Sequence, residues 1–288
     1  MRTQSEIEKA YNDGRSLIRS FNKNLTVNTT VGISQDLSGV SGNPVAQYFL
    51  GPSGESTQMS YLLNDKGIDH GGTMDGYKKF IHGMTLQTVT AALAPSILML
   101  MDYLMFYSFI GMDTGLQNLT NSVTLPRYSR ADGIQMMMIE QNPYSGGATV
   151  QVGYTNQDGV SGRVTPVITL NGSTSIGTVA TSAPSAAGSF GNFLPLQSGD
   201  YSVEKIDTIE FLTGDVGTVC LLLCKPIATF AIYETTTPCD YDLWNHLGYL
   251  PEVKNDAYLN FILKPAANGT GAVTNTIFGN MTTIWKQV

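Results

Sequence analysis

The sequence predicts a mainly β protein: an antiparallel, jelly-roll-like β-sandwich with an N-terminal helix and extended arm and a helical insertion. Two observations predict the sandwich. Runs rich in β-branched and aromatic residues recur along the second half of the chain, and turns of Gly, Asn, Asp and Ser separate them. Short strands joined by frequent turns are typical of antiparallel sandwiches, whereas parallel strands need long crossover connections.

The first 22 residues predict an amphipathic helix, because Ser5 and Glu8 have the spacing of a capping box and apolar residues recur at helical intervals. Such a helix either packs on its own domain or docks on a neighbouring subunit. The apolar residues of its stripe, which are the candidate interface residues of the chain, are Ile7, Tyr11, Ile18 and Phe21.

Residues 23–58 are rich in Asn, Ser, Thr and Gly and contain only short apolar patches, such as 45–50. A segment of this composition cannot form a core by itself. We therefore expect residues 1–58 to be a helix and extended arm that contacts a neighbouring surface, and whose removal leaves a folded β-rich core.

The longest apolar region follows, from Gly83 to Met112, and it raises the alternative of a membrane-inserted element. Gln87, Pro95 and Asp102 would each be costly in hydrocarbon. The preferred interpretation is a pair of buried helices over 77–92 and 95–108, within a helix-rich segment (59–124) that packs on the core.

The sandwich core is expected over residues 125–234, followed by a C-terminal lobe over 235–288. Val150, Val152 and Tyr154 alternate with polar residues, and the turn at Asp158-Gly159 tolerates the backbone that a tight hairpin needs. The predicted strands cover residues 133–140, 149–154, 163–170, 175–181, 204–212, 217–224 and 227–233. Residues 182–189 are small and predict a flexible connection.

Composition excludes several classes of protein. Only 14% of the 288 residues are charged, and uncharged polar residues and 30 glycines fill the difference, which suits a protein packed against neighbours. The net charge of −7 and the lack of clustered Lys and Arg argue against nucleic-acid binding. The N-terminus lacks the apolar core of a secretory signal, so we expect a chain made in a cytoplasm.

No catalytic, cofactor or metal site is predicted, and we expect the protein not to be an enzyme. His70 has Asp65, Asp69 and Asp75 nearby in sequence, but their spacing does not match a calcium loop, so a metal site is the lesser alternative. His82 and a third histidine, His246, are expected to be structural. A glycosidase that uses two distant carboxylates stays open, because such a pair has no linear motif.

The three cysteines cannot all pair, and none has a second Cys/His pair at zinc-site spacing. We expect Cys220 and Cys224, which share one face of a strand, to pack in the core.

Four segments carry a resemblance to a known class: LPRYSRADGIQMMMIE (125–140), VQVGYTNQDGVSGRVTP (150–166), FLPLQSGDYSVEKIDTIEF (193–211) and VCLLLCKPIATFAI (219–232). Together with His70-Gly-Gly ahead of Lys78-Lys79, they resemble virion structural proteins of tailed bacteriophages, in particular capsid cement or decoration proteins. The resemblance covers about residues 60–235. It implies a β-rich subunit that forms homo-oligomers or contacts a major capsid protein or other virion subunits. It also implies a virion location after assembly in the bacterial host cytoplasm, with no cofactor, nucleic acid or membrane as partner.

Two alternatives remain. A tail or neck component would share all of these features. A carbohydrate- or receptor-binding β-sandwich, of the fibre or lectin type, would place exposed aromatic residues beside Asp, Asn and Gln, and Trp244 and Trp285 are the candidates for such a site.

Overall fold

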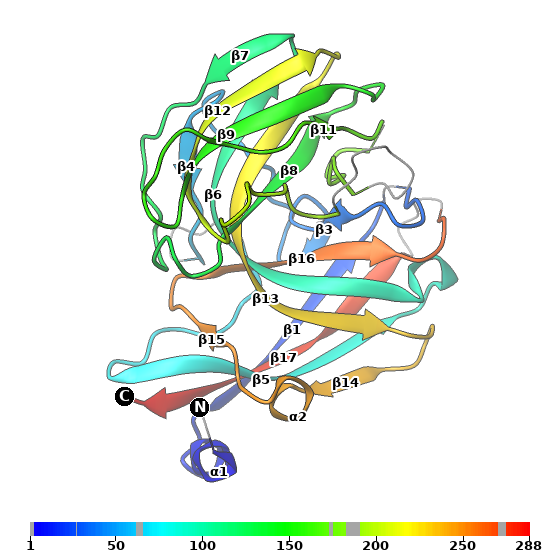
Figure 1. Ribbon diagram of the computed structural model, residues 1–288. Coiled ribbons are helices and arrows are strands. Elements are labelled where there is room, and N and C mark those ends of the chain that lie inside the picture. Colours follow the sequence, from blue (N-terminus) through cyan, green and yellow to red (C-terminus); the bar gives the residue numbers. More distant parts are fainter. Residues whose placement is uncertain (1–2, 27, 62–65, 173–174, 183–190, 270–274) are drawn as a thin grey trace.

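The computed structural model describes residues 3–26, 28–61, 66–172, 175–182, 191–269 and 275–288. Within these residues the strands form three antiparallel sheets, which lie one above another in Figure 1. The predicted fold class, a mainly β protein built as an antiparallel sandwich, is confirmed. No helix among the described residues is long and apolar enough to cross a membrane.

The lower sheet has the strand order β14-β5-β17-β1-β3, with β15 beside β5. β1 and β17 pair antiparallel along the whole of β1, so that Ser16 at its start faces Ile284 near the C-terminus. The strands of this sheet are β1 (Ser16–Asn24), β3 (Ser41–Asn43), β5 (Tyr77–Thr88), β14 (Cys239–Asp242), β15 (Glu252–Val253) and β17 (Thr276–Gln287).

The middle sheet has the order β2-β16-β6-β13-β8, with β4 beside β6, and the upper sheet has the order β10-β9-β12-β7, with β11 beside β9. The middle strands are β2 (Gln35–Asp36), β4 (Ser56–Gln58), β6 (Ser96–Gly111), β8 (Gln135–Asn142), β13 (Thr218–Ile232) and β16 (Tyr258–Pro265). The upper strands are β7 (Gly115–Asn118), β9 (Thr149–Asn156), β10 (Arg163–Val164), β11 (Ile168–Thr169) and β12 (Val203–Thr213).

The long strands β6 and β13 belong to both halves of the molecule (Figure 1). Leu221 and Leu223 pack in the core under the upper sheet, whereas Phe230 and Ile232 pack in the core over the lower sheet. The register of β13 against β6 shifts between Pro226 and Ala228. Because of this irregularity, odd-numbered residues face the cores before the shift and even-numbered residues face them after it. One face of the middle sheet therefore covers two cores in succession.

The opposite face of the middle sheet carries a third core. Strand β13 contributes Cys220, Leu222 and Cys224, and Phe49 and Met59 from the N-terminal part of the chain cover them. The two cysteines thus pack in a core, as expected, and burial raises the pKa of each thiol.

The two helices expected over 77–92 and 95–108 are wrong, since these residues form β5 and β6 with a short 3-10 turn, η2 (Ala91–Leu93), between them. In β5, the buried Met84 and Leu86 alternate with Thr85 and Gln87, which is the period of a strand. β6 lies between β16 and β13 and is buried on both faces, so its apolar run is continuous and carries no period.

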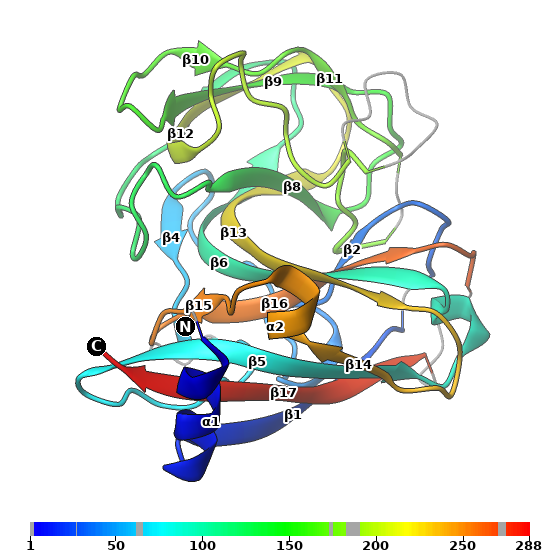
Figure 2. The ribbon, with the colours of Figure 1, turned by 60° about the horizontal axis from the view of Figure 1, so that its bottom comes forward.

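The helix expected over residues 1–22 is shorter. α1 (Gln4–Asn12) ends where Gly14 adopts a φ of 66°, and Arg15 then leads into β1. The expected capping box is absent, because Thr3 is the N-cap residue and its side chain makes no capping hydrogen bond. α1 lies below the lower sheet in Figure 1, and Figure 2 shows it crossing the outer side of that sheet, near both chain ends.

The expected arm over 1–58 lies along the protein's own sheets. It supplies β1 to the inside of the lower sheet and β2 and β4 to the middle sheet. Its strands find their hydrogen-bond partners within the chain, so it is part of the fold described here.

Most of the predicted strands of the sandwich are present, with three changes. The strand predicted over 163–170 is two short strands, β10 and β11. The strands predicted over 217–224 and 227–233 merge into one strand, β13. Pro226 lies beyond the end of the β8 pairing and faces Met101 of β6 at a register irregularity, a position at which a strand tolerates proline. Residues 175–181 contribute only isolated bridges, at Thr178 and Val179. Residues 183–189 of the predicted flexible connection lie outside the described residues.

Candidate functional site

The four candidate interface residues do not share one helix face, because α1 ends before two of them. Ile7 lies on the buried face of α1. Phe21 is buried in the lower core, and the centre of its ring lies 5.1 Å from that of Phe261. Tyr11 and Ile18 are exposed, at 41% and 63%. Contact of these two residues with another subunit stays a prediction.

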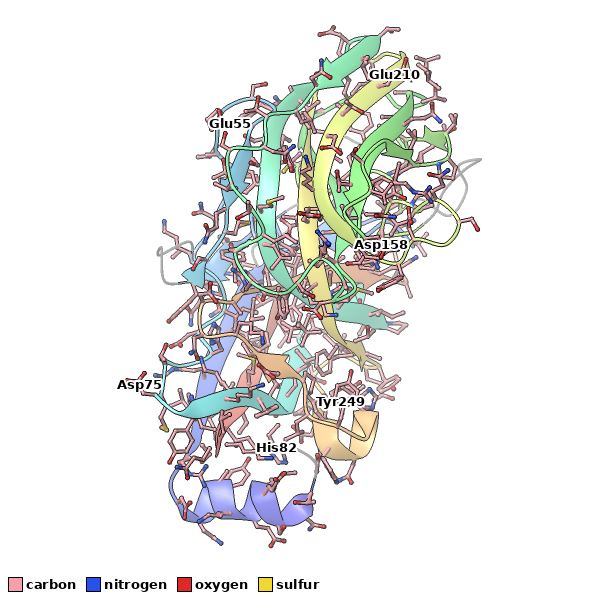
Figure 3. All side chains as sticks on the ribbon, turned by 60° about the vertical axis from the view of Figure 1, so that its left-hand side comes forward. Glu55, Asp75, His82, Asp158, Glu210 and Tyr249 are labelled. Carbon is pink, nitrogen blue, oxygen red and sulfur yellow. The ribbon has the colours of Figure 1, made fainter. Side chains whose placement is uncertain are left out.

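Ile7 and Tyr11 line a groove of about 450 Å³ between α1, β5 and α2 (Leu243–Leu247). The Tyr11 hydroxyl lies 2.8 Å from Nδ1 of His82, and the two rings meet edge to face. His82 Nε2 lies 3.9 Å from Oδ1 of Asp242, the N-cap residue of α2. Figure 3 shows His82 on the side of the lower sheet that faces α1.

His70 is fully buried, and both of its ring nitrogens contact groups of the protein. Its Nε2 lies 2.8 Å from the Ala257 carbonyl, and its Nδ1 lies 2.8 Å from Nζ of the buried Lys79, which also donates to the Gly71 carbonyl. Nε2 therefore carries the hydrogen, and Nδ1 accepts from the ammonium. Burial, and then the charge of Lys79, lower the pKa of His70 to about 4.

The structure explains the first glycine of the pair that follows His70. Gly71 has a φ of 82°, and a Cβ there would lie 2.5 Å from Cδ2 of Leu17 and 2.9 Å from the Trp285 ring. The chain thus passes close to the lower sheet at a point where only glycine fits.

Two of the three acidic residues near His70 in sequence, Asp69 and Asp75, lie in the part of the chain that the structure describes. Asp69 pairs with Arg19 at 2.7 Å, and Asp65 lies outside the described residues. Among the residues that the structure describes, no three His, Cys, Asp or Glu side chains form a group that could hold a metal ion. His246 lies in the last turn of α2, with its ring edge to face on Tyr241.

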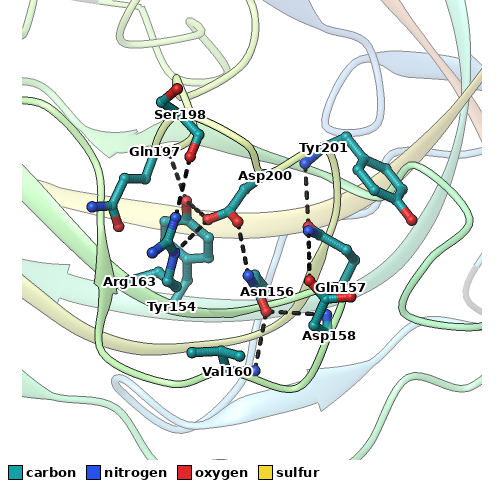
Figure 4. Close-up of polar contacts among 10 residues, drawn as sticks. All are labelled: Tyr154, Asn156, Gln157, Asp158, Val160, Arg163, Gln197, Ser198, Asp200 and Tyr201. Atoms are coloured by element: carbon teal, nitrogen blue, oxygen red, sulfur yellow. Dashed lines mark hydrogen bonds and ion pairs between the residues drawn. The ribbon is translucent and has the colours of Figure 1, made fainter.

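A network around Asp200 joins a loop to the β9–β10 hairpin (Figure 4). Asp200 accepts hydrogen bonds from Tyr154 Oη, Asn156 Nδ2 and Arg163 Nε, at 2.7–2.8 Å. Burial acts to raise the pKa of Asp200, but these hydrogen bonds outweigh it and hold the pKa below its usual value. Gly159, in the predicted Asp-Gly turn, has a φ of 76°. All of these hydrogen bonds join side chains of this chain to one another, so the network holds the loop that carries Asp200 against the β9–β10 hairpin.

A buried ion pair joins Asp102, in the middle of β6, to Arg127. Arg127 binds both carboxylate oxygens of Asp102, and it also donates to the backbone carbonyls of Met59 and Tyr103. Burial acts to lower the pKa of Arg127, but the hydrogen bonds that it donates to Asp102 outweigh burial and raise the pKa of the guanidinium. The pair is enclosed and available to no ligand.

Residues 44–52, here called the strap, form the exposed apolar surface that the sequence analysis missed. Phe49 is buried against Tyr103 and Phe106 of the middle sheet, with ring centroids 6.2 and 5.4 Å away. Its neighbours Tyr48 and Leu50 are 52% and 66% exposed.

The strap is held in place by the rest of the chain. Gln141 Nε2 donates to the Phe49 carbonyl at 2.8 Å, and Ser108 Oγ donates to the Gly51 carbonyl at 3.0 Å. Tyr48 and Leu50 also line a cavity of about 280 Å³, together with Ile139 of β8 and the exposed Ile176. The signal in the sequence was the apolar patch at 45–50 inside a polar segment.

No family model matches the sequence, and no curated protein matches it. Among solved structures, the chain is similar to a point mutant of the VP2 protein of infectious bursal disease virus in derived T=1 particles, with 9% identity, 93% of this chain and 77% of that chain covered, and a TM-score of 0.18. The structure of the Gt strain of the same virus gives 10% identity, 94% and 80% coverage and a TM-score of 0.18. These values describe a weak likeness.

Proposed function

We propose that this chain is a structural subunit of a virion, of the capsid cement or decoration kind, and that the strap contacts a major capsid protein or another virion subunit. The observation that carries the proposal is the strap itself. Val45, Tyr48 and Leu50 are each more than half exposed on a segment that the middle sheet holds rigidly. An ordered apolar surface loses little conformational entropy on binding, so it suits attachment.

Three further features support the proposal. The surface has few charged residues, and long charged side chains are depleted at the centres of protein interfaces. The mainly β architecture agrees with the class that the sequence resembles. The buried histidine and the enclosed Asp102–Arg127 pair have structural contacts, so the proposal includes the absence of catalysis.

Purified virions of the virus that encodes the chain provide the first test. Quantitative mass spectrometry should find the chain at a fixed number of copies per particle, and labelled antibodies should decorate the head. Absence from the particles would contradict the proposal, and labelling confined to the tail or neck would replace the cement role with the alternative.

Strap variants test the attachment surface. Tyr48→Ser with Leu50→Ser should lower the occupancy of particles at least tenfold, since two large apolar side chains contribute about 1.5–3 kcal/mol each when fully buried. Tyr201→Ser is the matched control, because Tyr201 is 55% exposed and lies in the upper half of the molecule. Equal occupancy for the strap variant and the control would exclude the strap as the contact.

A further inference from the structure

The groove between α1 and α2 combines side chains that no part of the fold requires to meet. Strand β5 supplies His82, α1 supplies Tyr11, and the start of α2 supplies Asp242 and Trp244. The groove holds about 450 Å³, which lies within the usual size of small-ligand sites. Its complete lining is Gln4, Ile7, Glu8, Tyr11, Asn12, His82, Asp242, Trp244 and Asn245.

The gap between His82 and Asp242 matches a hydroxyl group. The Tyr11 hydroxyl is hydrogen-bonded to His82 Nδ1, and in the tautomer in which Tyr11 donates, His82 Nε2 carries the hydrogen and lies 3.9 Å from Oδ1 of Asp242. That distance is too long for a direct hydrogen bond. A hydroxyl is both donor and acceptor, so one ligand hydroxyl can accept from Nε2–H and donate to the carboxylate.

Asp242 retains the capacity for this bond. Its Oδ1 accepts from the backbone N–H groups of Trp244 and Asn245, and its Oδ2 accepts from Nδ2 of Asn245. A carboxylate offers about four acceptor positions, two on each oxygen, so the one that remains for a ligand hydroxyl is on Oδ2. The capping role also holds the carboxylate in a fixed place at the edge of the groove.

The charge and the aromatic groups of the groove define the class of ligand. Of the described residues, no Lys or Arg lines the groove, whereas Glu8 and Asp242 do, so these two carboxylates would repel an anionic ligand. The partly exposed Trp244 and Tyr11 present apolar ring surface beside polar groups, which suits a ligand with apolar faces and a polar rim. A sugar ring has this character.

We propose that the α1–α2 groove binds a neutral carbohydrate, with one sugar hydroxyl bridging His82 Nε2 and the Asp242 carboxylate and with the sugar ring against Trp244 or Tyr11. This site is separate from the strap and does not depend on the proposed structural function. It gives the chain a second binding activity at the end of the molecule where both chain ends lie.

Tryptophan emission of the full-length protein can test the proposal. Trp244 lies in the groove, whereas Trp285 is 6% exposed, so a ligand in the groove changes chiefly the emission of Trp244. The probes are neutral disaccharides of glucose, galactose, mannose and N-acetylglucosamine, with sialyllactose as the anionic probe and spermine as the cationic one. At least one neutral disaccharide should give a saturable change below 10 mM, and sialyllactose and spermine should not.

Two variants assign the binding to the proposed contacts. Asp242→Ser keeps an N-cap residue but removes the carboxylate, and His82→Phe keeps a ring but removes the donor. Asp242→Ser should raise the Kd for the disaccharide about tenfold or more, because it removes a hydrogen bond to a charged group. His82→Phe should raise the Kd by a smaller factor, because the hydrogen bond that it removes joins two neutral groups. Tyr201→Ser should leave the Kd unchanged.

Thermal unfolding checks that both variants are folded. No response to any neutral disaccharide, a response to spermine or sialyllactose of equal strength, or a Kd that neither variant changes would each overturn the proposal.

Discussion

Asp102 and Arg127 show how a single charged residue can sit inside an apolar strand. Asp102 is the charge that ends the long uncharged run of the sequence, and it lies fully buried in the middle of β6. Both of its oxygens accept hydrogen bonds from Arg127, and the Tyr258 N–H adds another. A buried charge is stable only with such complete pairing.

Arg127→Ala should therefore destabilise the protein strongly. It leaves Asp102 buried without its counter-charge, and the expected loss in the free energy of unfolding is about 3–5 kcal/mol by urea denaturation. The double variant Asp102→Leu with Arg127→Met removes both charges and should recover most of that loss. If the double variant is as unstable as Arg127→Ala, the cost arises from lost packing and not from the unpaired charge.

His70 gives the protein a specific sensitivity to acid. The pKa of His70 is about 4 in the folded protein and about 6.5 when unfolded, so the unfolded chain binds the additional proton first. The resulting stability is present above pH 6.5 and is lost as the pH falls towards 4, by up to about 3 kcal/mol. His70→Gln should flatten this part of the stability curve relative to the unchanged protein, measured by urea unfolding at pH 7, 5.5 and 4. Parallel curves for the two proteins would show that other groups cause the acid sensitivity.

Strand β1 separates the candidate interface residues into two kinds. Phe21 points into the lower core, and Ile18 points outward from the same strand. Phe21→Ala should reduce the free energy of unfolding by about 3–5 kcal/mol. Ile18→Ala should change it by less than about 0.5 kcal/mol, because its side chain is exposed. Chemical denaturation of both variants measures this difference, and a large loss for Ile18→Ala would mean that Ile18 is covered, for example by a second subunit.

Individual strands also show how far the sequence predicts the fold. The β9–β10 hairpin was predictable, because its alternation and its Asp-Gly turn are local signals. β6 was not, because a strand buried on both faces shows no period and its apolar length is typical of a buried helix. In β5 the alternation from Met84 to Thr88 was present, but the apolar run that follows obscured it.

The candidate sites divide in a similar way. The sequence predicted Tyr11 as an interface residue, because it belongs to the apolar stripe of an expected helix, and Trp244 as a possible sugar contact, because it is an aromatic residue among Asp and Asn. It could not predict that His82 and Asp242 meet, because they are far apart in the chain and the pairing of β14 with β5 brings them together. The sequence shows the strap only as an apolar patch, because the contacts of Phe49 that fix it on the middle sheet are made with residues far away in the chain.

For the whole molecule, the position of β1 decides which truncations can fold. A chain that starts at Arg15 loses α1 and with it the buried side chains of Ile7 and Ala10, and it should fold with a lower melting temperature. A chain that starts at Met59 loses β1 from the inside of the lower sheet and should not fold. Far-UV circular dichroism and thermal unfolding distinguish the two. A cooperative transition for the chain that starts at Met59 would restore the expectation that residues 1–58 are a removable arm.

The pairing of β1 with β17 also determines how the molecule responds to force. Ser16 and Ile284 are register partners, so the two chain ends leave the lower sheet at the same end of the β1–β17 pair. Tension applied between the ends would load the hydrogen bonds of this pair one after another, as in a zipper, and not all together. The protein should therefore open at low force from its termini, whereas a load applied through the strap would act on the middle sheet and leave that seam closed.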